Sequence, residues 1–384
     1  MRVYLDNTAT SWPKPKSVVE AITDYMVHCG ASPGRSGHRM SLQAAHIIYD
    51  ARDLIAKMFN AEASEKVIFT ANATLASNIA LKGILKKGDH AIISHLEHNS
   101  TLRPLKHLEQ SGLIDLSIID CDKNGNINIE QLKNSFRPNT KIVATIHGSN
   151  VIGKVLPIAE IGAICKTHSV LYMIDAAQTA GFVPIDMQAQ HIDILTFTGH
   201  KKLYGPSGTG GLCFGKNVEI DTFIHGGSGS KSEIEFHPDF YPDKLEAGTP
   251  NTVGIAGLKA GLEFIFSEGI DKIRQHSHNI SKYFIDNLLK IDEIKIHGYD
   301  SENEVLPVIS VTSPLITPSK FAEILDKDYE IMTRPGLHCA PLAHKAAGTF
   351  PQGTLRFSPG YFNTQEEIDY TIKSLKEILV IKNT

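Results

Sequence analysis

Short apolar runs alternate with segments of helical periodicity between about residues 65 and 215. Strands that alternate with helices in this way pair in parallel and form a sheet with helices on both faces. The pattern therefore predicts an α/β fold with a mostly parallel central sheet. The predicted strands cover residues 66–70, 90–94, 113–119, 142–146, 170–174, 194–197 and 211–214, and the predicted helices cover 76–85, 102–110, 129–136 and 158–167.

The periodicity is lost between residues 220 and 250, where Gly226-Gly-Ser-Gly-Ser230 and several Pro and Asp residues occur. Long irregular segments inside compact domains commonly serve a function, so we predict an active-site or interface loop. Two helical patterns, at 255–266 and 270–289, then lead into a smaller lobe. We predict that this lobe is a βαβ unit, with strands at 308–311 and 354–357 and helices at 319–325 and 365–379.

The bulk properties fit a globular protein with two lobes. A chain of 384 residues exceeds one ordinary hydrophobic core, and 42% hydrophobic with 21% charged residues is a globular composition. The net charge of −4 and the lack of a basic run argue against partners such as nucleic acids or membrane surfaces. We find no apolar segment of signal-peptide or membrane-spanning length, so we expect no membrane association.

The five cysteines, Cys29, Cys121, Cys165, Cys213 and Cys339, are odd in number and widely spaced. They form no CxxC pair and no zinc-type spacing, so we expect no metal site and a reduced, cytoplasmic setting. The glycine-rich segment 205–211 lacks the Gly-Lys-Ser/Thr ending of a P-loop. Sequence signatures of metalloproteases, serine hydrolases and dinucleotide-binding folds are also absent in the required context.

Two predicted strands end close to ionisable residues, Asp175 after 170–174 and Lys201 after 194–198. Open α/β sheets bind their ligands at the carboxyl ends of the strands. A buried lysine can act as an amine nucleophile, and a buried aspartate needs a cationic partner. Pyridoxal phosphate requires both groups: a lysine binds its aldehyde and a carboxylate binds its pyridinium nitrogen. Alone, Asp175 could be a helix N-cap and Lys201 a solvated loop residue, but the ordered pair favours this cofactor.

The sequence around these two residues resembles that of the class V aminotransferases, a family of fold-type I pyridoxal-phosphate enzymes. Within the class, the chain is most similar to the cysteine desulfurases and selenocysteine lyases. The resemblance implies a large cofactor-binding domain at 16–265 and a smaller α/β domain formed by 1–15 and 266–384. The motifs that carry it are Tyr4–Asn7, Glu97–Asn99, His147–Gly153, Asp175–Gln178, Thr198–Pro206, Glu246–Asn251, Arg334–Pro341 and Leu355–Ser358.

The resemblance implies a phosphate site formed by Ala73, Thr74, Thr198, His200 and Thr249. The helix expected after the strand at 66–70 would present free amides to an anion, and we expect Thr74 also to cap that helix. The family usually has Gly-Thr-Thr where this chain has Asn72-Ala73-Thr74, so the residue before Thr74 contributes only its backbone amide. Thr249 matches a residue that reaches the phosphate of a neighbouring subunit, which implies a homodimer.

The resemblance also assigns residues to the cofactor ring and the substrate. Asp175 would keep the pyridinium nitrogen protonated, and Gln178 would donate to the phenolic oxygen. His98 would stack on the ring and assist proton transfer, although one of 18 histidines could equally be an ordinary loop residue. Asn150 would lie beside the phenolic oxygen and the substrate carboxylate. Arg356 would bind that carboxylate with a bidentate guanidinium; without the resemblance it could be a solvated arginine.

Cys339 is the candidate nucleophile, because it alone lies in a loop bounded by Gly and Pro. The other four cysteines lie in or beside regular elements and are expected to be packed. A loop thiol beside His338 can be rich in thiolate. The family's second histidine is replaced by Leu337, and we expect His344 and Lys345 to supply the local positive charge instead.

Together these residues predict a cysteine desulfurase. It would remove sulfur from L-cysteine, or selenium from L-selenocysteine, and leave L-alanine. The sulfur would be held as a persulfide on Cys339 and pass to an acceptor such as a protein. One alternative is a class V aminotransferase or β-elimination lyase, in which Cys339 is only a loop residue. The other is a catalytically idle paralogue that binds a partner; intact Lys201, Asp175 and Arg356 argue against it.

Overall fold

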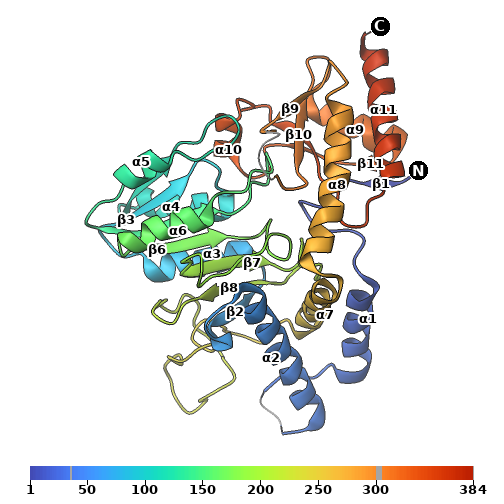
Figure 1. The fold of residues 1–384 in the computed structure, drawn as a ribbon. Coiled ribbons are helices and arrows are strands. Elements are labelled where there is room, and N and C mark those ends of the chain that lie inside the picture. The colour runs from blue at the N-terminus through green and yellow to red at the C-terminus, as the bar shows by residue number, and fades with distance from the viewer. Residues whose placement is uncertain (35–36, 300–304, 384) are drawn as a thin grey trace.

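The structure, a computed structural model, describes residues 1–34, 37–299 and 305–383. A seven-stranded sheet forms its centre (Figure 1). Five of its strands are parallel, and β8 runs antiparallel to both of its neighbours, β2 and β7. The order of the strands is β2 (Val67–Thr70), β8 (Gly210–Phe214), β7 (Ile194–Thr198), β6 (Leu171–Asp175), β5 (Thr140–Ile146), β3 (Asp89–Ser94) and β4 (Ile114–Ile119).

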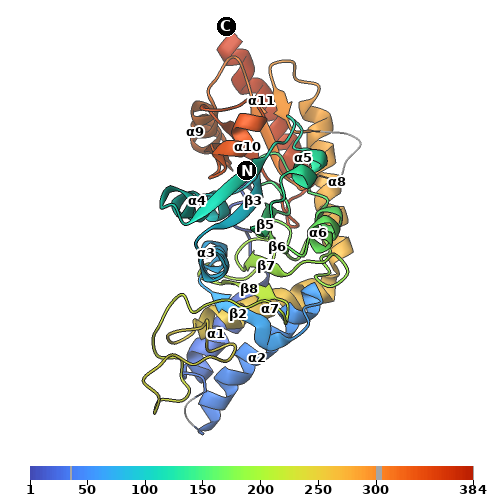
Figure 2. The ribbon, with the colours of Figure 1, turned by 90° about the vertical axis from the view of Figure 1, so that its left-hand side faces the viewer.

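Alternate residues of these strands face two different cores. Ile92 packs in the cluster that contains residues of α2, α6 and α7, whereas Ala91 and Ile93 pack in the cluster that contains residues of α3 and α4. Helices therefore cover both faces of the sheet, as Figures 1 and 2 show, and the predicted α/β fold with a mostly parallel sheet is confirmed. The helices are α2 (Arg39–Phe59), α3 (Ala73–Ile84), α4 (Asn99–Gln110), α5 (Ile129–Asn134), α6 (Ile158–Thr167) and α7 (Thr252–Glu268).

A second sheet of four strands, in the order β12-β13-β10-β9, is antiparallel throughout. The prediction of a βαβ unit with parallel neighbours is therefore wrong. Strands β10 and β12, joined through α9, run in the same direction, but β13 inserts between them in the opposite direction. The bounds are β9 (Lys295–His297), β10 (Ile309–Thr312), α9 (Pro318–Tyr329), β12 (Arg334–Gly336), β13 (Thr354–Phe357), α8 (Ile270–Leu288), α10 (Pro341–Ala346) and α11 (Gln365–Asn383).

The N-terminal segment forms a separate two-stranded sheet with β11 and then runs to the central sheet. Strand β1 (Val3–Tyr4) pairs in parallel with β11 (Ile331–Met332), and Val3 packs in the same core as residues of α8, α9 and α11. The chain then crosses to the main sheet, where the amide of Ser11 donates to the carbonyl of His200 at 3.1 Å. The N-terminus lies near α11 in Figure 1. The assignment of 1–15 to the small domain, and the domain boundaries, stay predictions.

Three further segments lie beside α7 in Figure 1: α1 (Lys16–Asp24), η1 (Tyr25–Cys29) and α2. Residues 215–251 contain no helix or strand, as the missing periodicity predicts. Within the described residues, no helix has both the length and the apolar character needed to cross a bilayer.

Candidate active site

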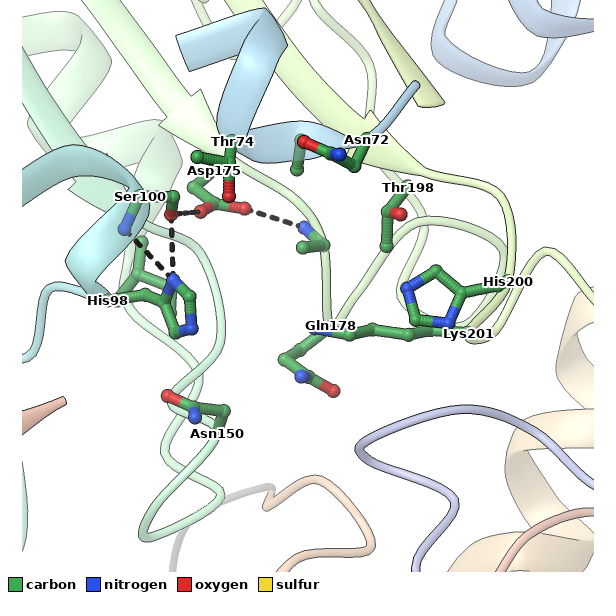
Figure 3. Close-up of a pocket in the computed structure, with 13 residues that line it drawn as sticks. Asn72, Thr74, His98, Ser100, Asn150, Asp175, Gln178, Thr198, His200 and Lys201 are labelled. Atoms are coloured by element: carbon green, nitrogen blue, oxygen red, sulfur yellow. Dashed lines mark hydrogen bonds between the residues drawn. The ribbon is translucent and has the colours of Figure 1, made fainter. Parts of the chain in front are cut away.

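Asp175 and Lys201 lie at the carboxyl ends of two adjacent parallel strands. Asp175 is the last residue of β6, and Lys201 follows the end of β7 by three residues. The two strands pair directly, so the side chains reach one cavity, which is drawn in Figure 3. The residues that line this cavity are Asn72, Ala73, Thr74, His98, Ser100, Ile146, Asn150, Asp175, Ala177, Gln178, Thr198, His200 and Lys201.

Asp175 is buried and held by two donors (Figure 3). The amide of Ala177 donates to its Oδ1 at 2.9 Å, and the hydroxyl of Ser100 donates to its Oδ2 at 3.1 Å. Only one helical turn follows Asp175, since Ala180 N bonds to Ala176 O and no α-helix forms there. The carboxylate is therefore fixed in place at the cavity and is not the cap of a helix.

His98 is neutral and presents a defined nitrogen. Burial, followed by the charge of Lys201, lowers its pKa to about 4. Its Nδ1 accepts the amide of Ser100 at 3.0 Å, so the proton of the neutral ring resides on Nε2. A ring with this tautomer can cover the face of a planar ligand and exchange a proton through Nε2.

Lys201 has the electrostatic environment of a reactive amine. Burial lowers its pKa to about 8, against the opposing effect of Asp175. The neutral amine is therefore far more populated near neutral pH than it is in an ordinary lysine. The neighbouring Lys202 differs, because its Nζ lies 4.0 Å from the ring centroid of Phe182 and it does not line the cavity.

The start of α3 forms one wall of the cavity. Asn72 caps this helix, because its Oδ1 accepts the amide of Leu75 at 2.9 Å. The prediction that Thr74 is the cap is therefore wrong; Thr74 lies in the first turn, where amides have no helical acceptor. Thr198 and His200 also line the cavity, and burial lowers the pKa of His200 to about 4. Thr249 is exposed and lies outside this cavity.

Arg356 is 2% exposed and already engaged. Its Nη2 lies 2.9 Å from Asp6 Oδ1, and its Nη1 donates to the carbonyl of Asn150 at 3.0 Å. Its Nε has no partner within the part of the chain that the structure describes. Asp6 also pairs with Arg334, whose Nη2 lies 2.8 Å away. One guanidinium edge is thus held by protein while Nε remains unsatisfied, as expected of a group that awaits an anionic ligand.

Two amide side chains leave unpaired atoms at the cavity. Gln178 Nε2 donates to the carbonyl of Thr8 at 3.1 Å, and Asn150 Nδ2 donates to the carbonyl of His338 at 2.6 Å. Oε1 of Gln178 and Oδ1 of Asn150 are buried without a partner among the described residues. Because buried polar atoms are normally paired, both atoms indicate a polar ligand here.

Cys339 lies between β12 and α10 and is exposed, while Cys29, Cys165 and Cys213 are buried and Cys121 is partly buried. The backbone is left-handed at Cys339 (φ 58°) and at His338 (φ 48°), a conformation that costs energy in residues other than glycine. Both carbonyls are tied to the cavity walls: Asn99 N donates to Cys339 O at 2.8 Å, and Asn150 holds that of His338. The loop is thereby fixed beside the cavity.

Neither neighbouring histidine supplies the positive charge predicted beside Cys339. Burial lowers the pKa of His338 to about 2 and the pKa of His344 to about 4, so both are neutral near pH 7. That part of the prediction is wrong. Lys345 lies over the ring of Phe350, 5.3 Å from its centroid. The cations that interact electrostatically with Cys339 are Lys201, Arg334 and Arg356.

Comparison with known proteins places this arrangement in a family. The profile described as aminotransferase class-V matches residues 3–371. A protein of Methanothermobacter thermautotrophicus named probable cysteine desulfurase is 33% identical and aligns with 98% of this chain and 94% of its own. The apo structure of cysteine desulfurase from Thermococcus onnurineus NA1 superposes with a TM-score of 0.91 at 32% identity, covering 98% and 94% of the two chains. For the cysteine desulfurase CsdA of Escherichia coli, in an S-sulfonic acid form, the TM-score is 0.89 at 27% identity and coverage is 99% and 95%.

Proposed function

The chain belongs to the aminotransferase class-V family, and on this premise we propose that it is a pyridoxal-phosphate-dependent cysteine desulfurase. The observation that carries the proposal is the position of Cys339. This exposed thiol lies on a loop whose own carbonyl is bound by Asn99, one residue from His98 in the cavity wall. An aminotransferase needs no thiol at this place. The relative and the solved structure compared above are also named cysteine desulfurases.

The residues of the cavity fit pyridoxal phosphate. The cofactor supplies an aldehyde that condenses with amines and a ring that accepts electrons released at the substrate carbon. Lys201 would hold the aldehyde, and the buried Asp175 would hold the pyridinium nitrogen. Gln178 would face the phenolic oxygen and His98 one face of the ring. The first turn of α3, through Ala73 and Thr74, would bind the phosphate together with Thr198 and His200. The buried carboxylate of Asp175 and the amine of Lys201 in one cavity support a ligand of this kind.

The protein's own groups would then bind and orient the amino acid. Arg356 would receive the substrate carboxylate through its unpaired Nε, beside Asn150. The substrate sulfur would then have to face the loop of Cys339, whose carbonyl accepts the amide of Asn99. Lys201, whose pKa of about 8 leaves both protonation states accessible, would move protons at the substrate α carbon.

Sulfur transfer would begin with the thiolate form of the exposed Cys339 side chain. The thiolate attacks the substrate sulfur, so a sulfur–sulfur bond forms and the carbon–sulfur bond breaks. The electron pair of the broken bond remains with the substrate carbon, which takes up a proton, and the product leaves as L-alanine. The same thiol could attack the selenium of L-selenocysteine. The outer sulfur of the Cys339 persulfide would then pass to an acceptor, for example a protein thiol.

We also propose a cytoplasmic homodimer with domains at 16–265 and at 1–15 with 266–384. The absence of disulfides among the five cysteines supports a reduced compartment. Exposed apolar side chains on α1, η1, α2 and the irregular loop support a partner surface: Val19, Met26, Val27, Met40, Leu42, Tyr49 and Phe236. Thr249 lies near the end of that loop and outside the cavity of its own subunit. This position is expected of a residue that reaches the cofactor phosphate bound in the other subunit of the dimer.

A product assay tests the function. Purified protein supplied with pyridoxal phosphate, L-cysteine and a reducing thiol should release alanine and sulfide in equal amounts, and L-selenocysteine should give alanine and selenide. Release of pyruvate and ammonia with sulfide would identify a β-elimination lyase instead. Formation of alanine only when a keto acid is supplied would identify an aminotransferase.

A further inference from the structure

One backbone carbonyl beside the cavity accepts an unusual number of hydrogen bonds. The carbonyl of His200 receives the hydroxyl of Thr10 at 3.0 Å, and the amide and hydroxyl of Ser11 at 3.1 and 3.3 Å. Nζ of Lys14 also donates to it at 2.8 Å. A carbonyl oxygen has two lone pairs, so these donors saturate it. The carbonyl belongs to the peptide bond between His200 and Lys201, the two residues proposed for the phosphate and the aldehyde.

Lys14 is also bonded to one of the other donors, Ser11. Its Nζ also donates to the hydroxyl of Ser11 at 2.8 Å, while that hydroxyl donates to His200. Burial lowers the pKa of Lys14 to about 8, which is the cost of holding an ammonium group away from water. Among the described residues no carboxylate forms an ion pair with it. The charge of Lys14 is therefore directed at the His200–Lys201 peptide and not at an acidic side chain.

Among the described residues, those proposed to bind the phosphate carry no positive charge near pH 7. Thr74 and Thr198 are uncharged, and His200 is neutral near pH 7 because burial, Lys201 and then Lys14 lower its pKa to about 4. Of the described residues that line the cavity, Lys201 alone carries a positive charge near pH 7, and it is the residue proposed to bind the aldehyde. A phosphate dianion buried beside neutral donors alone would be poorly compensated. The ammonium of Lys14, which donates to the carbonyl of His200 at 2.8 Å, is a cation bound to the backbone of a residue in this wall of the cavity.

We propose that Lys14 is a positioning residue for the cofactor: its ammonium fixes the His200–Lys201 peptide and balances the charge of the phosphate. This inference rests on the proposed function, since it requires pyridoxal phosphate in the cavity. Lys14 lies outside the cavity lining, so it acts through His200 and does not touch the reacting atoms.

The test compares four variants of the full chain, stripped of cofactor and titrated with pyridoxal phosphate. Loss of one charge-assisted hydrogen bond should weaken binding about tenfold in Lys14→Met. Lys14→Gln keeps a donor without the charge and should also bind weakly, within about threefold of Lys14→Met. Lys14→Arg keeps the charge and should recover most of the affinity. Lys16→Met is the matched control, because Lys16 is 90% exposed on the neighbouring helix and should bind like the wild type.

The thermal midpoint of each cofactor-free variant separates this role from general destabilisation, because the proposal predicts weaker binding without a matching loss of stability. Equal affinity of Lys14→Met and the wild type would overturn the inference. So would a Lys14→Arg variant that binds as weakly as Lys14→Met, or a Lys14→Gln variant that binds like the wild type. A wild-type protein that forms no borohydride-sensitive absorbance band with pyridoxal phosphate would instead overturn the proposed function on which the inference depends.

Discussion

Asp6 and Arg356, separated by 350 positions in the chain, form a buried ion pair in which Oδ1 and Nη2 lie 2.9 Å apart. Asp6 also binds Arg334 from β12, the strand that leads into the Cys339 loop. The N-terminal segment thereby connects the proposed carboxylate-binding group with the strand that carries the nucleophile. The substrate carboxylate would meet a guanidinium whose orientation is already fixed, which lowers the entropy lost on binding.

Replacement of Asp6 should destabilise the fold, because it leaves the charge of Arg356 uncompensated in the interior. We expect Asp6→Asn to lower the free energy of unfolding by about 2–3 kcal/mol, as buried ion pairs do when one partner is lost. Urea denaturation measures this change. Glu20→Gln is the control, since Glu20 pairs with Lys16 at the surface with 60% of its side chain exposed, and should cost less than about 0.5 kcal/mol. Equal effects of the two changes would contradict a structural role for Asp6.

Lys201→Ala should abolish turnover and leave the circular dichroism spectrum of the fold unchanged. The amine is needed on the cofactor aldehyde and at the substrate α carbon, and Lys202 cannot replace it because its Nζ lies against Phe182. Borohydride treatment followed by peptide mass analysis should label Lys201 in the wild type. Turnover retained in the variant would show that another amine performs this chemistry.

Asp175→Asn should reduce turnover by about 100-fold or more, because the ring nitrogen would lose its charge partner. Cofactor affinity should change less, since the contacts proposed for the phosphate remain. Ser100→Ala, which removes the donor to Asp175 Oδ2, should cause a smaller loss in the same direction. Steady-state rates with equilibrium titration of the cofactor separate the two quantities. A wild-type rate in Asp175→Asn would leave Asp175 without a catalytic role.

The pKa of Lys201 predicts how the cofactor-free protein combines with pyridoxal phosphate. Only the neutral amine attacks an aldehyde, and burial lowers the pKa of Lys201 from 10.5 to about 8. The combination rate should therefore rise with pH up to about 8 and then level off. Stopped-flow measurement of the absorbance change gives this profile. A rate that still increased steeply between pH 9 and about 10 would indicate a lysine with an ordinary pKa.

The sheet and the two strand-end residues could be predicted because they depend on local patterns. Apolar runs located all seven strands of the central sheet to within a few residues. The position of Asp175 and Lys201 at strand ends then follows from the rule that ligands bind at that edge. The motifs also indicated the class V family correctly, as the match over residues 3–371 confirms.

The supporting contacts could not be predicted, because they join residues that are distant in sequence. Nothing in the segment around Ser100 indicates a bond to Asp175, 75 residues away, and the contact of Lys14 with His200 spans 186. The antiparallel second sheet was missed because periodicity does not record the direction in which strands pair. The positive charge expected at His344 was wrong because burial, which the sequence does not show directly, keeps that imidazole neutral.

The central claim is that Cys339 receives the sulfur. Cys339→Ala should still bind L-cysteine through Lys201 and Arg356 but should form alanine from it only at background level. A smaller loss is expected with L-selenocysteine, because selenide leaves more readily. Cys121→Ala is the matched control, since Cys121 is only partly buried and lies outside the cavity lining, and it should keep wild-type activity.

The most direct measurement is the mass of the Cys339 peptide after wild-type protein has reacted with L-cysteine in the absence of reductant. The proposed reaction predicts one additional sulfur atom on this peptide and on no other cysteine-containing peptide, and reductant should remove it. An unmodified Cys339 peptide, together with undiminished alanine formation by Cys339→Ala, would contradict the desulfurase mechanism.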